Sequence, residues 1–319
     1  MFISENKVMK AINEIIEDIK SLKIQGARNV AKAAIKAIMT YLKQSDAKTV
    51  EELVAGATKV AFELMHARPT EPMARNMLED ILKFMLFEIS VEASSVEEFK
   101  EKVIKAEEHY LNLFDENVKK LSEIGANYIQ ENALPITYCH SSTVVALLKK
   151  AYDMGKLRGV IVCETRPLYQ GRKTATELAD YGIDVTFIVD SAMGVFAKKA
   201  DFAIVGGDAV TTAGDLVNKI GTSTLARIIH SYDKSFFSAV ESWKFDPYTN
   251  YGFREPIEER DPSEVWRDAP KGVNIRNPAF DVTPARYINA FITEVGVYPP
   301  QRFEEAFEKA RQMLYPNQA

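Results

Sequence analysis

The chain of 319 residues contains only two cysteines and four histidines, and both shortages narrow the kinds of site that it can form. Cys139 and Cys163 are too few for a disulfide framework, and the histidines lack the spacing of a metal site. We therefore expect no bound metal and a cytoplasmic location. In a reducing compartment, at least one thiol remains free to act as a base or a nucleophile.

The sequence also lacks long apolar runs, an excess of basic charge and the glycine motifs of nucleotide binding. No segment approaches the roughly 20 apolar residues that span a bilayer. The net charge is −5, which leaves no basic surface of the size that binds nucleic acid. Neither G-x-G-x-x-G nor a P-loop occurs. We therefore expect no membrane, no nucleic acid and no dinucleotide cofactor as a partner.

The first part of the chain has the periodicity of helices. One face of the first predicted helix carries apolar residues at helical spacing, among them Val8, Ile12 and Ile16. The same pattern predicts further helices at residues 28–43, 50–65, 71–89 and 96–125. We therefore predict a helical domain at residues 1–126.

After residue 133, short runs rich in β-branched residues alternate with helical segments. The predicted strands are residues 135–138, 159–162, 185–189, 202–205 and 236–240. Continuous apolar strands separated by helices favour a parallel sheet that is covered on both faces. We therefore predict an α/β protein, with a Rossmann-like doubly wound domain at residues 127–319. The charged segment 250–268 is predicted to form an interface or a lid.

A thiol and three hydroxyl side chains follow the first predicted strand. Cys139 ends this strand, and Ser141, Ser142 and Thr143 lie where the next helix begins. Helix N-termini favour anions, so the pKa of a thiol there can fall towards neutrality, which would make a thiolate base available. The alternative is a buried cysteine beside residues that only cap the helix.

A carboxylate, Asp208, follows another predicted strand after two glycines. Gly206 and Gly207 would let the backbone approach a ligand closely. Near apolar walls, the pKa of this carboxyl can rise and suit it to general acid catalysis. It can equally be an aspartate with local hydrogen bonds in a turn. Asp190, at another strand end, has the same two interpretations.

The loop after the second predicted strand combines an acid and an arginine. We interpret it as structural, with Glu164 holding Arg166, although Arg166 could also bind substrate. Cys163 has no polar cluster after it and is interpreted as a packing residue. Other basic residues lie beside Gly or Pro near predicted helix starts, where anions bind; these are Arg28, Arg68 and Lys219.

In this order, the motifs resemble the family that unites ribose-1,5-bisphosphate isomerases, methylthioribose-1-phosphate isomerases and the regulatory subunits of translation initiation factor 2B. The matching segments span nearly the whole chain and are Gly26-Ala27, Ala67-Arg68-Pro69-Thr70, Cys139-His140-Ser141, Glu164-Thr165-Arg166-Pro167, Gln170-Gly171, Asp190-Ser191, Gly207-Asp208, Asn218-Lys219-Ile220-Gly221-Thr222 and Phe280-Asp281-Val282-Thr283-Pro284. The resemblance implies homo-oligomers, either dimers or hexamers built from dimers.

The resemblance also implies which residues act. In the isomerase branches, the residues that match Cys139 and Asp208 form the catalytic pair. The implied contacts with a phosphorylated sugar substrate are Gln25, Gly26, Ala27, Arg28, Arg68, Ser141, Ser142, Thr143, Asn218, Lys219 and Lys244. Gln25 stands where the family usually has arginine, and Arg28 can replace that guanidinium.

Cys139-His140-Ser141 and Lys244-Phe245 are similar to the archaeal ribose-1,5-bisphosphate isomerases. The expected activity is therefore aldose–ketose isomerisation of ribose 1,5-bisphosphate to ribulose 1,5-bisphosphate in AMP salvage, with no cofactor. Two alternatives stay open: a methylthioribose-1-phosphate isomerase, and a noncatalytic regulatory subunit, which the segments 141–144 and 192–194 resemble.

An enol-phosphate route fits this pair of residues. A protonated Asp208 would donate to the ring oxygen, and the Cys139 thiolate would remove the C2 proton. A hydride shift from C2 to C1 is the competing chemistry, and the sequence does not separate the two. Closure of the helical domain over the sheet is expected to exclude water.

Overall fold

The computed structural model describes residues 2–68, 70–91, 95–251 and 257–314. The chain divides into two compact units, Met1–Glu116 and Asn117–Ala319. Five helices account for the first unit, and the last of them continues into the residues of the second. They are α1 (Phe2–Lys20), α2 (Ala27–Gln44), α3 (Val50–Ala67), α4 (Pro72–Val91) and α5 (Val96–Tyr128). All five predicted helices are therefore confirmed.

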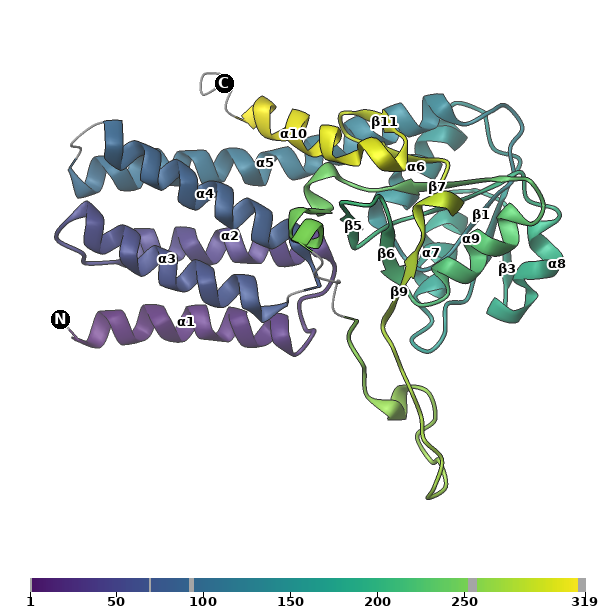
Figure 1. Ribbon diagram of the computed structural model, residues 1–319, viewed down its shortest axis with the longest axis horizontal. Coiled ribbons are helices and arrows are strands. Elements are labelled where there is room, and N and C mark those ends of the chain that lie inside the picture. The colour runs from purple at the N-terminus through teal and green to yellow at the C-terminus, as the bar shows by residue number, and fades with distance from the viewer. Residues whose placement is uncertain (1, 69, 92–94, 252–256, 315–319) are drawn as a thin grey trace. The chain divides into compact units, whose positions relative to one another are not determined.

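Helix α2 lies at the centre of the first unit, where it packs against α1, α3 and α4 (Figure 1). Its buried stripe includes Val30, Ala34 and Ile38, which recur at helical spacing. The next helix, α3, begins at a side-chain cap, since Thr49 accepts a hydrogen bond from the backbone N–H of Glu52. Within the described ranges, no helix is both long enough and apolar enough to cross a membrane.

The second unit contains a seven-stranded sheet in the order β11-β10-β7-β4-β1-β2-β3. Its strands are β1 (Pro135–Thr137), β2 (Val160–Cys163), β3 (Val185–Ile188), β4 (Phe202–Val205), β7 (Ser235–Ala239), β10 (Ala290–Thr293) and β11 (Gly296–Tyr298). Six strands run parallel, and β11 pairs antiparallel with β10 at one edge. The five predicted strands are confirmed, whereas β10 and β11 were missed.

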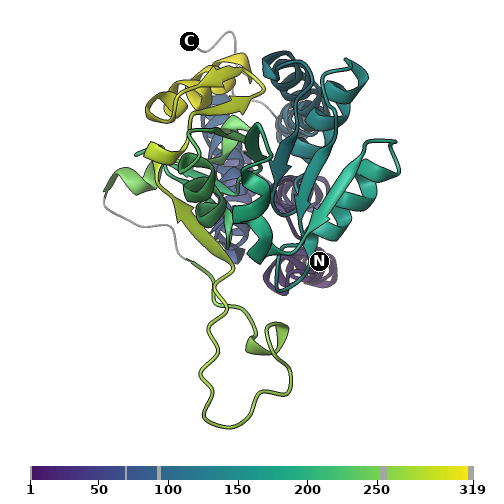
Figure 2. The same cartoon turned by 90° about the vertical axis from the view of Figure 1, so that its right-hand side faces the viewer.

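Helices connect the parallel strands and cover both faces of this sheet (Figures 1 and 2). From β1 the chain passes to β2 and β3 in one direction, and from β4 it passes to β7 and β10 in the other. Because such crossovers are right-handed, reversal of direction moves the helices to the opposite face. One face carries α6 (Ser142–Asp153) and α7 (Gln170–Ala179), and the other carries α8 (Met193–Ala197) and α9 (Thr222–His230). The predicted doubly wound α/β fold is confirmed.

A second, four-stranded sheet was not predicted. It has the order β8-β5-β6-β9, built from β8 (Phe245–Asp246), β5 (Ala209–Thr211), β6 (Leu216–Lys219) and β9 (Phe280–Thr283). Ala209, Val217 and Phe280 form part of its own small core. The last helix, α10 (Phe303–Leu314), packs against β8. This sheet receives the chain directly after β4, so it positions the residues that follow Asp208.

An arm at residues 257–279 extends from the small sheet and returns into β9 (Figures 1 and 2). Its two limbs are joined by hydrogen bonds from Ala279 N to Glu258 O and from Arg260 N to Asn277 O. The arm includes most of the predicted interface or lid segment, of which residues 252–256 lie outside the described residues. Its function as a lid stays a prediction.

Gly171 provides a direct test of how tightly α7 packs against β2. A Cβ atom at this position would lie 1.8 Å from the carbonyl oxygen of Cys163, which is backbone and cannot rotate away. We expect Gly171→Ala to lower the free energy of unfolding by about 3 kcal/mol because it overpacks this contact. Gly194→Ala in α8 is the matched control, since its Cβ would meet nothing within 4 Å. Equal urea midpoints for the two variants would contradict the packing argument.

Candidate active site

Polar side chains gather where the parallel strands of the large sheet end. Cys139 follows β1, Thr165 follows β2, Asp190 follows β3, Asp208 follows β4 and Glu241 follows β7. The carboxyl ends of parallel strands lie at the same edge of a sheet, where α/β proteins bind their ligands. This edge of the second unit is therefore the candidate active site.

The backbone of Cys139 is held in an unusual conformation. Its φ is 65°, in the left-handed region that residues other than glycine rarely adopt. Its N–H donates to Thr165 Oγ1 at 2.9 Å, and its carbonyl oxygen accepts from Thr174 Oγ1 at 2.9 Å. These bonds hold a conformation that costs energy, as is common at functional sites.

Thr165 is held in turn by Asp190. The Asp190 carboxylate accepts from Thr165 N at 2.8 Å, from Arg166 N at 2.7 Å and from the Tyr138 hydroxyl at 3.4 Å. These bonds come from residues 24 to 52 positions away rather than from its own turn, so Asp190 joins separate loops, and its interpretation as a general acid stays a prediction. Thr165 belongs to a segment that matches the family, but its bond to Cys139 was not predicted, because it depends on a contact between two loops.

Arg166 has a structural role, but its partners differ from the predicted one. Its guanidinium donates to the Tyr169 hydroxyl at 2.9 Å and to the Val265 carbonyl at 2.8 Å, rather than to Glu164. The arginine thus ties the loop after β2 to the arm. Cys163 is fully buried, in agreement with its interpretation as a packing residue.

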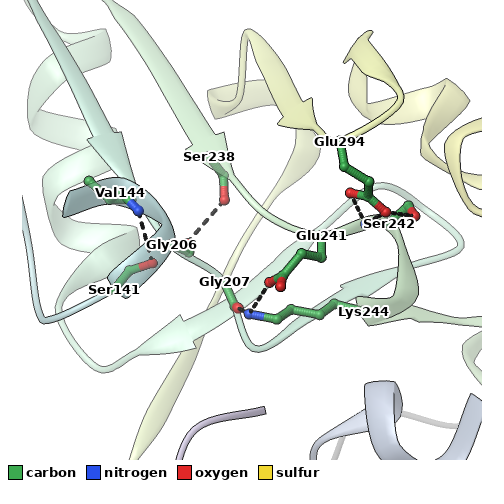
Figure 3. A network of polar contacts seen from close by, with 9 residues as sticks. All are labelled: Ser141, Val144, Gly206, Gly207, Ser238, Glu241, Ser242, Lys244 and Glu294. Atoms are coloured by element: carbon green, nitrogen blue, oxygen red, sulfur yellow. Dashed lines mark hydrogen bonds and ion pairs between the residues drawn. The ribbon is translucent and has the colours of Figure 1, made fainter. Parts of the chain in front are cut away.

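Gly206, Gly207 and Asp208 are each held by a hydrogen bond to a backbone atom; Figure 3 shows the bonds to the two glycines. Ser238 Oγ donates to the Gly206 carbonyl at 3.0 Å, and Lys244 Nζ donates to the Gly207 carbonyl at 2.7 Å. The N–H of Asp208 donates to the Val217 carbonyl at 2.9 Å. Asp208 itself is half-buried.

The two glycines also serve packing within the protein, and a close approach of a ligand to their backbone stays a prediction. A Cβ on Gly206 would lie 2.7 Å from the Ser141 side chain. A Cβ on Gly207 would lie 2.5 Å from Leu216. Both contacts bring the loop before Asp208 close to neighbouring elements.

Lys219 and Asn218 lie in β6, and both are buried. Asn218 Nδ2 donates to Thr222 Oγ1 at 3.0 Å. Desolvation lowers the pKa of Lys219, and the positive charge of Arg260 lowers it further, whereas Cys139 and Asp208 act in the opposite direction. The ammonium of Lys219 is thus close enough to the predicted catalytic pair to interact with both.

The predicted lowering of the Cys139 pKa is wrong. The Cys139 side chain is only partly buried by surface area, but desolvation by the surrounding protein raises the pKa of this thiol to about 12, and the nearby charges of Asp208 and Asp190 add to the rise. A backbone hydrogen bond from His140 and the charge of Lys219 only partly oppose it. Loss of water from the thiolate therefore outweighs the nearby helix N-terminus.

The N-terminus of α6 agrees with the helix-cap alternative. Ser141 is the N-cap, and its hydroxyl accepts from Val144 N at 3.3 Å (Figure 3). Ser142 is exposed and Thr143 is buried. Contacts of these three residues with a substrate stay predictions.

The N-terminus of α9 is already occupied by a carboxylate. Asp281, in β9, accepts from Gly221 N at 2.8 Å and from Ser223 N at 3.1 Å. Desolvation raises its pKa to about 6 despite these bonds. The predicted capture of an anion at the helix start after Lys219 is therefore corrected, because Asp281 fills that place.

The predicted contacts in the first unit have varied surroundings. Gly26 precedes α2 with a φ of 83°, between an exposed Gln25 and a buried Ala27. Arg28 is half-buried. Arg68 is buried, and its guanidinium lies 2.7 Å from a carboxylate oxygen of Glu71. Their contacts with a substrate stay predictions.

No group of three or more His, Cys, Asp or Glu side chains among the residues that the structure describes could hold a metal ion. The site also brings together a thiol, a carboxylate and a desolvated ammonium, which are groups that can transfer a proton and interact with an anion.

Comparison with known proteins agrees with this arrangement of fold and site. A family model described as the initiation factor 2 subunit family matches residues 23–300. The chain belongs to this family. The family includes enzymes as well as translation factors, so its members differ in activity.

Several relatives are isomerases by name. A ribose 1,5-bisphosphate isomerase from Methanocaldococcus jannaschii is 42% identical, over 92% of this chain and 93% of its own length. A methylthioribose-1-phosphate isomerase from Acetivibrio thermocellus is 34% identical, over 96% and 94%. A crystal structure of translation initiation factor eIF-2B from Pyrococcus horikoshii OT3 has a TM-score of 0.75 and 30% identity, over 92% and 98%. The chain is an enzyme, an isomerase of this family.

The reactivity of Cys139 towards iodoacetamide tests its raised pKa. Because only the thiolate reacts, the alkylation rate of the substrate-free protein should rise about tenfold per pH unit between about pH 7 and pH 10. Mass spectrometry of the labelled peptide measures this rate. Cys139→Ser retains only the buried Cys163 and gives the background. A rate that levels off near neutral pH would contradict the raised pKa.

Proposed function

We propose that this isomerase converts ribose 1,5-bisphosphate to ribulose 1,5-bisphosphate, with Cys139 and Asp208 as its acid–base pair. The observation that supports the pair is that Cys139, Asp208 and Lys219 lie near enough at the carboxyl edge of the sheet for the charges of Asp208 and Lys219 to shift the pKa of Cys139. The substrate is supported by the 42% identical relative of that name. A step in AMP salvage is the metabolic role that this activity would serve.

The raised pKa of Cys139 reverses the roles that the sequence predicted. A thiol with a pKa of about 12 is protonated at neutral pH, so it enters the reaction as an acid. Asp208, half-buried beside it, then serves as the base. We propose this assignment in place of a thiolate base and a protonated carboxyl.

The proposed reaction begins with opening of the sugar ring. The Cys139 thiol donates its proton to the ring oxygen as the bond from C1 to that oxygen breaks. Asp208 removes the C2 proton, and the electron pair of that bond forms the C1–C2 double bond of an enol phosphate. Asp208 then returns a proton to C1. The Cys139 thiolate takes the proton of the C2 hydroxyl, which becomes the ketone, so both residues regain their starting states.

We propose that Lys219 is the cation that binds the anionic substrate at this site. A buried ammonium interacts strongly with an anion because little water screens its charge. Asn218 and Lys244 would add donors, and Ser141, Ser142 and Thr143 remain candidates at the start of α6. The predicted contacts of Gln25, Gly26, Ala27, Arg28 and Arg68 belong to the same proposal.

Activity assays of the purified protein test the proposal against its alternatives. We expect turnover of ribose 1,5-bisphosphate by the wild type, and a loss of about 10³-fold or more in kcat for Cys139→Ser and Asp208→Asn. Turnover of methylthioribose 1-phosphate alone would make that sugar the substrate. An inert wild type with both sugars would favour a noncatalytic regulatory subunit, the class of the translation-factor relatives.

The same assay in D₂O separates proton transfer from a hydride shift. Proton transfer through Asp208 predicts solvent deuterium at C1 of the product, detected by NMR. Complete retention of the C2 hydrogen at C1 would exclude Asp208 as an exchanging base and favour a hydride shift.

We also propose that the chain forms a homo-oligomer, either a dimer or a hexamer built from dimers. The edge strand β3 leaves Phe187 44% exposed, and Val195 in α8 is 65% exposed. Apolar side chains beside an unpaired strand edge favour association. Light scattering should therefore give at least a dimer mass, and Phe187→Lys should shift the mass towards the monomer. A monomeric wild type would contradict this proposal.

A cytoplasmic location remains a prediction.

A further inference from the structure

Glu294 is a buried acid at the end of β10 that the proposed reaction does not use. Only 5% of its surface is exposed. Its carboxylate accepts a hydrogen bond from Ser242 N at 3.0 Å and a short one from the Ser242 hydroxyl (Figure 3). Both donors thus belong to a single residue, in the segment that follows β7.

Ser242 begins a short 3-10 turn, Ser242–Lys244, that directs a lysine back towards β4. Lys244 Nζ donates to the Gly207 carbonyl at 2.7 Å and lies 3.6 Å from the Glu241 carboxylate. Figure 3 shows this row of contacts, which runs from the Glu294 carboxylate through the turn to the Gly207 carbonyl. The row joins the ends of β10, β7 and β4.

This row is costly to bury, which indicates that it does more than fill space. Ser242 is fully buried, and Glu241 is 1% exposed. Desolvation raises the pKa of Glu294 to about 7, although the bonds from Ser242 oppose the rise. An apolar side chain of similar size would avoid this desolvation cost, whereas a satisfied polar network specifies one geometry.

The segment that needs a specified geometry is the glycine pair before Asp208. Gly206 and Gly207 have no side chains through which packing could fix the loop. Among the described bonds, Ser238 binds the Gly206 carbonyl, and Lys244 binds the carbonyl of Gly207, the residue directly before Asp208. The orientation of the catalytic carboxylate then depends on where the turn places the lysine.

We propose that Glu294 is a positioning residue of this isomerase: it anchors the turn that carries Lys244, and Lys244 fixes the Gly207 carbonyl beside Asp208. The inference rests on the proposed function for the role of Asp208. Glu294 acts through the turn and does not touch the substrate.

Three variants at the end of β10 and two in the turn test the inference. Glu294→Leu removes both acceptors and should lower kcat at least about tenfold with KM changed less than about threefold, because the carboxylate of Asp208 loses its alignment. Glu294→Gln keeps an acceptor for Ser242 N and can donate to its hydroxyl, so kcat should stay within about threefold of the wild type. If Glu294→Leu does not fold, Ser242→Ala tests the same link and should also lower kcat rather than raise KM.

Thr293→Val is the matched control. Thr293 is buried next to Glu294 in the chain, but its hydroxyl donates to the Gly296 carbonyl at 2.8 Å, away from the turn. We expect this variant to lose stability without loss of kcat. A fall in kcat equal to that of Glu294→Leu would show a general effect of damage to the strand end and overturn the inference.

A double-mutant cycle with Lys244→Met tests whether the two residues act through one path. Once Lys244 is removed, Glu294→Leu should lower kcat by less than about twofold more, because the link to Gly207 is already broken. Independent, multiplying losses would overturn the inference.

Amide hydrogen exchange of the substrate-free protein supplies a readout that does not need a substrate: Glu294→Leu should speed exchange in residues 206–208, and Thr293→Val should not. Unchanged exchange would refute the positioning role, whereas an inert wild type with faster exchange would refute only the proposed function.

Discussion

Removal of water from charged groups at the carboxyl edge of the sheet is the constraint on which the candidate site depends. It raises the pKa of Cys139 and of Glu294, and it lowers that of Lys219. A buried charge is stable only beside partners, so every such group requires specific neighbours. The site supplies such neighbours from both sheets: Asp208 follows β4 of the large sheet, and Lys219 lies in β6 of the small one.

Hydrogen bonds between neighbouring loops supply the partners of these buried groups. On one side, Asp190 holds Thr165, and Thr165 holds the backbone of Cys139. On the other side, Glu294 holds Ser242, whose turn brings Lys244 to Gly207. In the proposed site, the thiol and the carboxylate are therefore positioned by two separate relays of hydrogen bonds. Cys139 and Asp208 both lie just beyond the end of a strand. Because the hydrogen bonds of the large sheet end before these residues, the bonds between loops are needed to hold them.

The parts of this arrangement that were predictable from sequence are those with a local signal. Helical periodicity identified α1 to α5, and runs of β-branched residues identified the central parallel strands. The small sheet has no such signal, because β8 has two residues and is formed only by pairing with β5. Asp281 caps the N-terminus of α9 from about 60 positions away in the chain, and no local sequence pattern predicts such a contact. Sequence thus located Cys139, Asp208 and Lys219, whereas their supports required the fold.

The electrostatics of Cys139 show why a local argument can give the wrong sign. A helix N-terminus stabilises an anion by roughly 0.3–2 kcal/mol, and the effect is limited to the first turn. Each pKa unit corresponds to about 1.4 kcal/mol, so a rise from 9.0 to about 12 outweighs that benefit. The proton then belongs on sulfur before substrate binds. A neutral thiol beside Asp208 keeps one negative charge in the pair instead of two, and an anionic substrate meets less repulsion. The same burial that delays formation of the thiolate therefore makes the thiol a suitable proton donor to a ring oxygen.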